Sequence, residues 1–91
     1  MAIRVEFFGT VQRRAGVAET ALVPIEGKMR LGEALAILAA RFPSLSGHCL
    51  EGNRMAEGFA ACIDGKIFVD DANYELEDGQ TLLILSSDAG G

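Results

Sequence analysis

The sequence predicts an α+β domain in which one helix packs across one face of a mixed β-sheet of four to five strands. One segment, residues 31–42, places its apolar side chains at helical spacing. Several other segments alternate apolar and polar residues, as strands with one buried face do. Because the chain has 91 residues, it has room for a single core, and we expect these elements to share it.

The composition is that of a folded acidic domain and argues against several classes of function. Apolar residues make up 49% of the chain, which is too much for a disordered protein. The formal net charge of −5 disfavours nucleic acid and anionic membrane surfaces as partners, since both repel acidic proteins. No apolar run approaches the ~18 residues that suggest a membrane span. The acidity either serves solubility or favours a protein partner with a basic surface.

Cys49 and Cys62 are expected to be reduced thiols of a cytoplasmic protein. They are too far apart for a Cys-x-x-Cys motif, and the first residues of the chain predict a strand and not a signal peptide. One disulfide between them remains an alternative, and Cys62 is predicted to be buried in a strand. His48 precedes Cys49, but zinc needs about four ligands and nothing completes the set, so we expect no metal site.

The first two predicted strands span residues 3–8 and 19–25. In the first of them Ile3, Val5 and Phe7 form one face, which we expect to be buried. Residues 12–16 are expected to form a loop, and residues 26–28 a turn. Pro24 has no N–H to donate, which suits the end of a strand or the edge of a sheet.

Residues 31–42 form the predicted helix. Its apolar stripe consists of Leu31, Ala34, Leu35, Leu38, Ala39 and Phe42. Glu33 suits the positive end of the helix dipole, whereas Arg30 is a poor N-cap, and Pro43 ends the helix. We expect the stripe to face the sheet, with each large side chain contributing about 1.5–3 kcal/mol.

The second half of the chain carries the strongest hairpin signal. Residues 44–58 have no period and are expected to form a long loop. Two strand-like runs, residues 59–63 and 66–69, then flank the turn residues Asp64 and Gly65. A polar connection over residues 70–76 is expected to follow.

The last predicted strand, residues 81–85, is apolar on both faces over residues 82–85. This favours a central position beside the first strand, with one face against the helix. The other face, together with Phe8, would form an apolar patch on the outside of the sheet. Residues 86–91 are small or polar and give a tail with no reason to fold.

Several short motifs occur in the order found in a known family. Residues 5–9 and 13–16, the helix start 31–35 with its end 41–43, the turn 63–66, residues 76–80 and the final Gly90-Gly91 resemble the MoaD/ThiS family of sulfur carriers. The resemblance implies a ubiquitin-like β-grasp domain over residues 1–86 and a flexible C-terminal tail over residues 87–91. Between the last strand and the glycines, however, the small subunit of molybdopterin synthase typically carries an aromatic residue and prolines, which residues 85–89 lack.

The same resemblance implies a protein co-substrate or non-catalytic subunit that is not itself an enzyme. The carboxylate of Gly91 would be adenylated by a ubiquitin-activating-like enzyme and converted to a thiocarboxylate, which then donates sulfur in cofactor or metabolite biosynthesis. ATP would be used by the activating enzyme, with no cofactor bound stably by the carrier. The first candidate for the sulfur-accepting enzyme is the large subunit of molybdopterin synthase.

The expected site comprises the chain end and the outer patch. Gly91 would react, and Gly90 would let the backbone pass through a narrow channel because it has no side chain. Partner-binding residues would be Phe8, Leu83, Leu85, Asp88 and Ala89. Two other classes of function remain open: a ubiquitin-like modifier conjugated to lysine through Gly91, and a plain β-grasp interaction domain whose tail is incidental.

Overall fold

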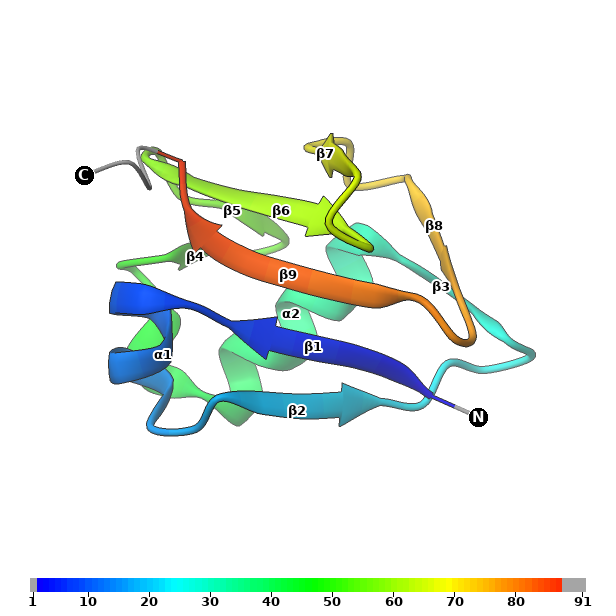
Figure 1. Ribbon diagram of the computed structural model, residues 1–91, viewed down its shortest axis with the longest axis horizontal. Helices are drawn as coiled ribbons and strands as arrows, with labels where there is room; N and C mark the ends of the chain where they lie inside the picture. The colour runs from blue at the N-terminus through cyan, green and yellow to red at the C-terminus, as the bar shows by residue number, and fades with distance from the viewer. Residues whose placement is uncertain (1, 88–91) are drawn as a thin grey trace.

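A mixed sheet and one long helix make up most of the computed structural model, which describes residues 2–87 (Figure 1). The sheet is five-stranded, in the order β2-β1-β9-β6-β7. Its strands are β1 (Ile3–Phe7), β2 (Glu19–Leu22), β6 (Phe59–Ile63), β7 (Ile67–Val69) and β9 (Thr81–Ser86). The helix α2 (Leu31–Arg41) crosses one face of this sheet. The predicted α+β fold with a mixed sheet is therefore confirmed.

The first and last strands are neighbours in the middle of the sheet, as the apolar character of residues 82–85 predicted. β1 and β9 pair in parallel, with Val5 opposite Leu82 and Phe7 opposite Ile84. The other pairs in this sheet are antiparallel. Alternation along β9 buries Leu82 and Ile84 completely on the helix side.

The core lies between α2 and the sheet. The predicted stripe faces inward, and Leu31, Leu35 and Leu38 are each at most 1% exposed. α2 ends at Arg41, one residue earlier than predicted, and Phe42 follows as its half-buried C-cap. The Phe42 ring still packs against the core, edge to face on Phe7.

Tertiary contacts compensate for the weak N-cap of α2. The backbone N–H groups of Leu31 and Gly32 donate to the carbonyl oxygens of Tyr74 and Ala72, at 2.8 and 2.9 Å. Glu33 accepts a hydrogen bond from the backbone N–H of Arg30 at 3.0 Å. The segment expected to be a polar connection therefore satisfies the N–H groups that a helix start leaves unpaired.

A second, shorter helix replaces the loop expected over residues 12–16. α1 (Gly9–Ala15) buries Val11 completely. Gly16 ends it in the left-handed region at φ +82°, and its N–H donates to the carbonyl of Gln12. The loop expectation was wrong because this helix buries only one of its seven residues and so shows no apolar stripe. The signal that could have found it is its ending, since arginines in the last turn followed by a glycine cap are common at helix C-termini.

Three further expectations about the connections were wrong. The second strand ends at Leu22, not at residue 25, and leaves Val23 and Ile25 exposed. The turn expected over residues 26–28 is present, but it leads into β3 (Lys28–Arg30), which pairs antiparallel with β8 (Glu75–Glu77) where a polar connection was expected. Residues 44–58 are not a plain loop, since they include part of η1 (Pro43–Leu45) and all of β4 (Leu50–Glu51) and β5 (Arg54–Met55).

Candidate functional site

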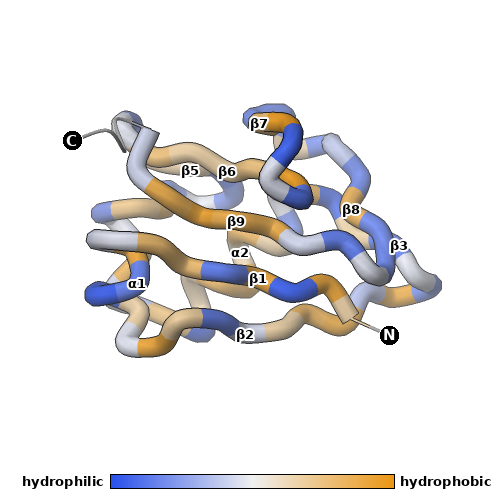
Figure 2. Tube along the Cα trace, viewed as in Figure 1, coloured by the Kyte–Doolittle hydropathy of each residue, from blue (hydrophilic) through white to orange (hydrophobic). Residues whose placement is uncertain are grey.

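The outer face of the sheet, opposite α2, is centred on β9, along which hydrophobic residues follow one another (Figure 2). Phe8 follows β1 directly and is 42% exposed, which the hypothesis of an outer patch requires. Its backbone is extended, and its N–H donates to the carbonyl of Ile84 at 3.1 Å. Continuing the β1–β9 register therefore brings Phe8 opposite Leu85, and Leu83 and Leu85 are both half-buried.

Residues from β6 and β7 extend this surface. Ala60 pairs with Leu85, while Cys62 pairs with Leu83 on one side and with Phe68 on the other. Phe68 is 69% exposed. We define the outer patch as Phe8, Ala60, Cys62, Phe68, Leu83 and Leu85. The β6 and β7 members were not predicted, because residues 59–63 and 67–69 are apolar throughout and do not show which face stays uncovered.

Acidic residues border the outer patch. Glu6 lies opposite Leu83 on one side and opposite Glu19 on the other. The ion pair of Glu6 with Arg4, at 3.6 Å, is largely exposed and adds little stability. Two carboxylates directly opposite each other on neighbouring strands repel. A cationic partner surface would relieve this repulsion, so the border favours a basic partner over an acidic one.

Two hydrogen bonds hold the chain where it leaves the sheet at the end of β9. The backbone N–H of Ser87 donates to the carbonyl of Gly58 at 2.8 Å, and the hydroxyl of Ser86 donates to the same oxygen at 3.3 Å. These bonds continue the β6–β9 ladder by one step beyond the pair Phe59 and Ser86. The predicted site residues Asp88, Ala89, Gly90 and Gly91 lie outside the described residues.

The two cysteines lie in different parts of the fold. Both are free and buried. Cys62 is buried in a strand, as predicted, but it belongs to the outer patch and not to the core between sheet and helix. Burial raises the pKa of the Cys49 thiol above its usual value, and nearby Arg14 opposes this shift only in part. Cys49 therefore stays protonated at neutral pH.

The residues that the structure describes show neither a metal site nor a membrane span. Within residues 2–87 there is no group of three or more His, Cys, Asp or Glu side chains arranged to hold a metal ion. His48 is exposed while Cys49 is buried, so the two do not form a ligand pair. In the same range there is no helix that is both long and apolar enough to cross a bilayer.

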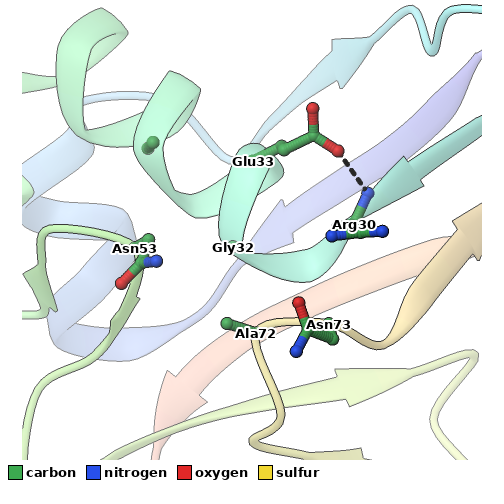
Figure 3. Close-up of a pocket in the computed structure, with 7 residues that line it drawn as sticks. Arg30, Gly32, Glu33, Asn53, Ala72 and Asn73 are labelled. Atoms are coloured by element: carbon green, nitrogen blue, oxygen red, sulfur yellow. Dashed lines mark hydrogen bonds between the residues drawn. The ribbon is translucent and has the colours of Figure 1, made fainter.

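A hollow of about 330 Å³ lies at the start of α2 (Figure 3). Its walls include Arg30, Glu33, Asn53 and Asn73. The hydrogen bond of Glu33 to the Arg30 backbone N–H, drawn in Figure 3, and the carbonyl of Ala72 already use helix-start donors that could otherwise hold an anion. We therefore assign no ligand to this hollow.

Comparison with known proteins establishes the fold. Neither a protein-family model nor a curated protein sequence matches the chain. SAMP1 from Haloferax volcanii is similar in structure, with a TM-score of 0.79, 17% identity and 100% of both chains covered. A putative molybdopterin converting factor, subunit 1, from Pyrococcus furiosus has a TM-score of 0.74 and 20% identity, with 94% of this chain and 97% of the other covered.

Urm1 from Trypanosoma brucei has a TM-score of 0.69 and 21% identity, with 99% of this chain and 95% of the other covered. At such identities the likeness shows the ubiquitin-like β-grasp fold and not an activity. It confirms the fold that the motif order predicted.

Proposed function

We propose that this protein is a sulfur carrier whose Gly91 carboxylate is activated and converted to a thiocarboxylate. The observation that carries the proposal is the course of β9. This strand lies in the centre of a β-grasp sheet, contributes Leu83 and Leu85 to the outer patch, and leads within five residues to Gly90-Gly91. A docking surface and a reactive chain end would thus belong to one continuous segment.

The chemistry requires activation because a carboxylate is a poor electrophile. A carboxylate oxygen of Gly91 would attack the α-phosphorus of ATP, and pyrophosphate would leave, giving an acyl adenylate. Hydrosulfide would then attack the carbonyl carbon, so that a C–S bond forms, the C–O bond to AMP breaks, and AMP departs. The activating enzyme would supply the catalytic groups, and the carrier would act as its protein substrate, not as an enzyme.

The outer patch is proposed to dock the activating enzyme. The exposure of Phe8 and Phe68 supports this, since a contiguous apolar surface with a polar border is typical of an interaction site. Binding energy gained there, remote from the reacting carbon, can orient the chain end in the active site of the enzyme. Glu6 and Glu19 would pair with basic residues at the edge of the contact.

The tail residues are proposed to act through their small size. Glycine has no Cβ, so Gly90 can pass through a channel that would exclude larger residues and can adopt backbone angles closed to them. Ala89 is the next smallest residue, and Asp88 would contact the partner near the channel entrance. Free thiols at Cys49 and Cys62 support a reducing compartment, so we place the reaction in the cytoplasm.

A sulfur-accepting enzyme would be the second partner. The likeness to a structure described as a putative molybdopterin converting factor, subunit 1, makes the large subunit of molybdopterin synthase the first candidate. The different residues before Gly90 leave room for another acceptor in cofactor or metabolite synthesis.

Conjugation to proteins is the second candidate function. The likeness to the small archaeal modifier protein 1 from Methanosarcina acetivorans, with a TM-score of 0.76, supports it. In this alternative a lysine amine, not hydrosulfide, attacks the Gly91 adenylate or a thioester formed from it, and an isopeptide bond results.

Intact-mass measurement tests the proposal. The chain is incubated with the activating enzyme of the same organism, ATP and a sulfide source. We expect the mass to rise by the exchange of one oxygen for one sulfur, and a chain lacking Gly91 to stay unchanged. Branched adducts in cell extracts without any thiocarboxylate would favour the modifier function. An unchanged mass under all conditions would favour the plain interaction domain.

A further inference from the structure

We infer that Gly58 is a positioning residue that fixes the point from which the C-terminal tail starts. The inference rests on the proposed function and adds a second segment to the site, since Gly58 lies in the connection between β5 and β6. Its carbonyl oxygen accepts hydrogen bonds from the Ser87 N–H and the Ser86 hydroxyl. Ser87 is the first residue of the predicted tail 87–91 and the last residue that the structure describes.

The turn that presents this carbonyl requires glycine. The Phe59 N–H donates to the carbonyl of Ala56 at 3.1 Å, which closes a four-residue turn. Gly58 occupies its third position with φ +88°. Among the described non-glycine residues only Glu26 and Asp64 have positive φ, so Glu57 at the second position does not. This combination is a type II turn, whose third position favours glycine.

The turn is tied to the core and not only to β9. The N–H of Ala56 donates to the carbonyl of Cys49 at 3.0 Å. Cys49 is completely buried, and Ala56 is 6% exposed. Backbone hydrogen bonds therefore link Cys49 to Ala56 and Ala56 to Phe59, and Gly58, the residue before Phe59, accepts the bond from Ser87. The aperiodic segment 44–58 thus has a role that its sequence did not suggest: it binds Ser87, where the predicted tail begins.

Anchoring at Ser87 sets the reach of the reacting end. Four residues follow Ser87, and they span at most about 13–14 Å when fully extended. Each residue released from the end of β9 would add ~3.3–3.6 Å of free chain and would spread the carboxylate over a larger volume. Because a misplacement of ~1 Å can cost about 100-fold in rate, loss of this anchor should affect the chemical step.

Gly79 provides a matched control. The Gln80 N–H donates to the carbonyl of Glu77 at 3.1 Å, and Gly79 has the same φ of +88° at the third position of that turn. An added Cβ would meet nothing within 4 Å at either glycine. Gly79 precedes β9, whereas Gly58 contacts its end. Valine at either position imposes the same backbone strain, but only Gly58→Val disturbs the hydrogen bonds to Ser86 and Ser87.

The test is ATP–pyrophosphate exchange with the activating enzyme, using the full chain. We expect Gly58→Val to lower kcat about tenfold with KM unchanged, and Gly79→Val to leave both constants near those of the parent. Gly58→Asn should recover most of the lost kcat, because asparagine tolerates positive φ. In amide hydrogen exchange, Ser87 should be protected in the parent and in Gly79→Val but not in Gly58→Val.

Several results would overturn the inference. Equal losses of kcat in Gly58→Val and Gly79→Val would reduce it to a general effect of strain, and an unchanged kcat with Ser87 unprotected would show that the anchor is irrelevant. If Gly58→Val does not fold, the α-hydroxy acid analogue of Ser87, in which an ester oxygen takes the place of the N–H, replaces it. A parent chain that is never adenylated contradicts the proposed function instead, while an unprotected Ser87 amide in the parent would still refute the anchor.

Discussion

The rings of Phe7 and Phe42 meet edge to face, with their centroids 5.3 Å apart and their planes at 80°. Phe7 ends β1, and Phe42 caps α2, so the contact joins the sheet to the helix at one end of the core. It also fixes the backbone immediately before Phe8, the exposed residue of the outer patch. Phe7 therefore contributes to the stability of the fold, while the next residue, Phe8, belongs to the outer patch.

Phe42→Ala should destabilise the protein by about 2–3 kcal/mol, somewhat below the 3–5 kcal/mol typical of a fully buried phenylalanine. Phe42 is only half-buried, which lowers the cost, but its replacement also removes the edge-to-face contact with Phe7. Urea unfolding measures the change. Ile37→Ala, on the outward side of the same helix, should cost less than about 1 kcal/mol. Equal losses in the two variants would contradict the role given to the aromatic contact.

Phe8→Asp should weaken docking without unfolding the domain. Because Phe8 is 42% exposed, the substitution should change the free energy of unfolding by less than about 0.5 kcal/mol. Loss of a central aromatic contact should raise KM for adenylation about 30-fold, which corresponds to a hot spot of about 2 kcal/mol. Val23→Asp is the matched control, since Val23 is apolar and 75% exposed but lies outside the patch. The docking proposal fails if both variants bind the activating enzyme like the parent.

Glu19→Lys should lower kcat/KM for adenylation and flatten its dependence on salt. Glu19 stands beside Glu6 at the border of the patch, and a positive charge there would repel the basic partner surface that we propose. The loss should shrink as ionic strength rises, because salt screens charges at the edge of an interface. Glu51→Lys, an exposed change on β4, should have no such effect. Faster adenylation by Glu19→Lys would indicate an acidic partner instead.

Part of the outer patch could be predicted from the sequence alone. Alternation in residues 3–8 and the apolar run 82–85 predicted the central strand pair and the exposure of Phe8, because strands alternate their faces strictly. Phe68 was missed because the patch depends on which strand lies beside β6, and a hairpin signal alone does not show which face stays uncovered. Gly58 was missed for a related reason: its contact with Ser87 joins segments 29 residues apart.

The elements that the sequence did not predict are short and stabilised by tertiary contacts. β3 and β8 each contain three residues, too few to show a period. Met29 and Leu76 pair across that ribbon, and Leu76 is completely buried. Similarly, the start of α2 depends on carbonyl groups from residues 72 and 74, which no local cap signal could reveal.

The stability of the protein should fall at alkaline pH because of Cys49. Its pKa is raised in the folded state, mainly by burial, so the folded protein holds the thiol proton more tightly than the unfolded chain does. This contribution is fully present below the unfolded pKa of about 8.5 and is lost as pH rises through the folded value. Melting temperatures at neutral and alkaline pH, compared between the parent and Cys49→Ala, measure it. A Cys49→Ala curve with the same alkaline slope as the parent would refute the assignment.

Deleting Gly91 and replacing Gly90 by alanine should have effects of different kinds. Deletion withdraws the carboxylate by one residue, ~3.3–3.6 Å along an extended chain, and even ~1 Å can cost about 100-fold in rate. We therefore expect adenylation to vanish. Gly90→Ala keeps the reach but adds a Cβ in the channel, so kcat should fall while KM, which reflects docking, stays near the parent value.

Gly90 and Gly91 are predicted to belong to the tail and not to the core that Leu35, Leu38 and Ile84 form, so both variants should melt at the temperature of the parent. ATP–pyrophosphate exchange, run beside a melting curve for each variant, separates the chemical effect from any loss of folding. A carboxylate that must reach the α-phosphorus of ATP cannot be replaced by one that stops a residue short. Normal exchange by the chain lacking Gly91 would therefore show that the terminus is not the reacting group, and the interaction-domain function would take its place.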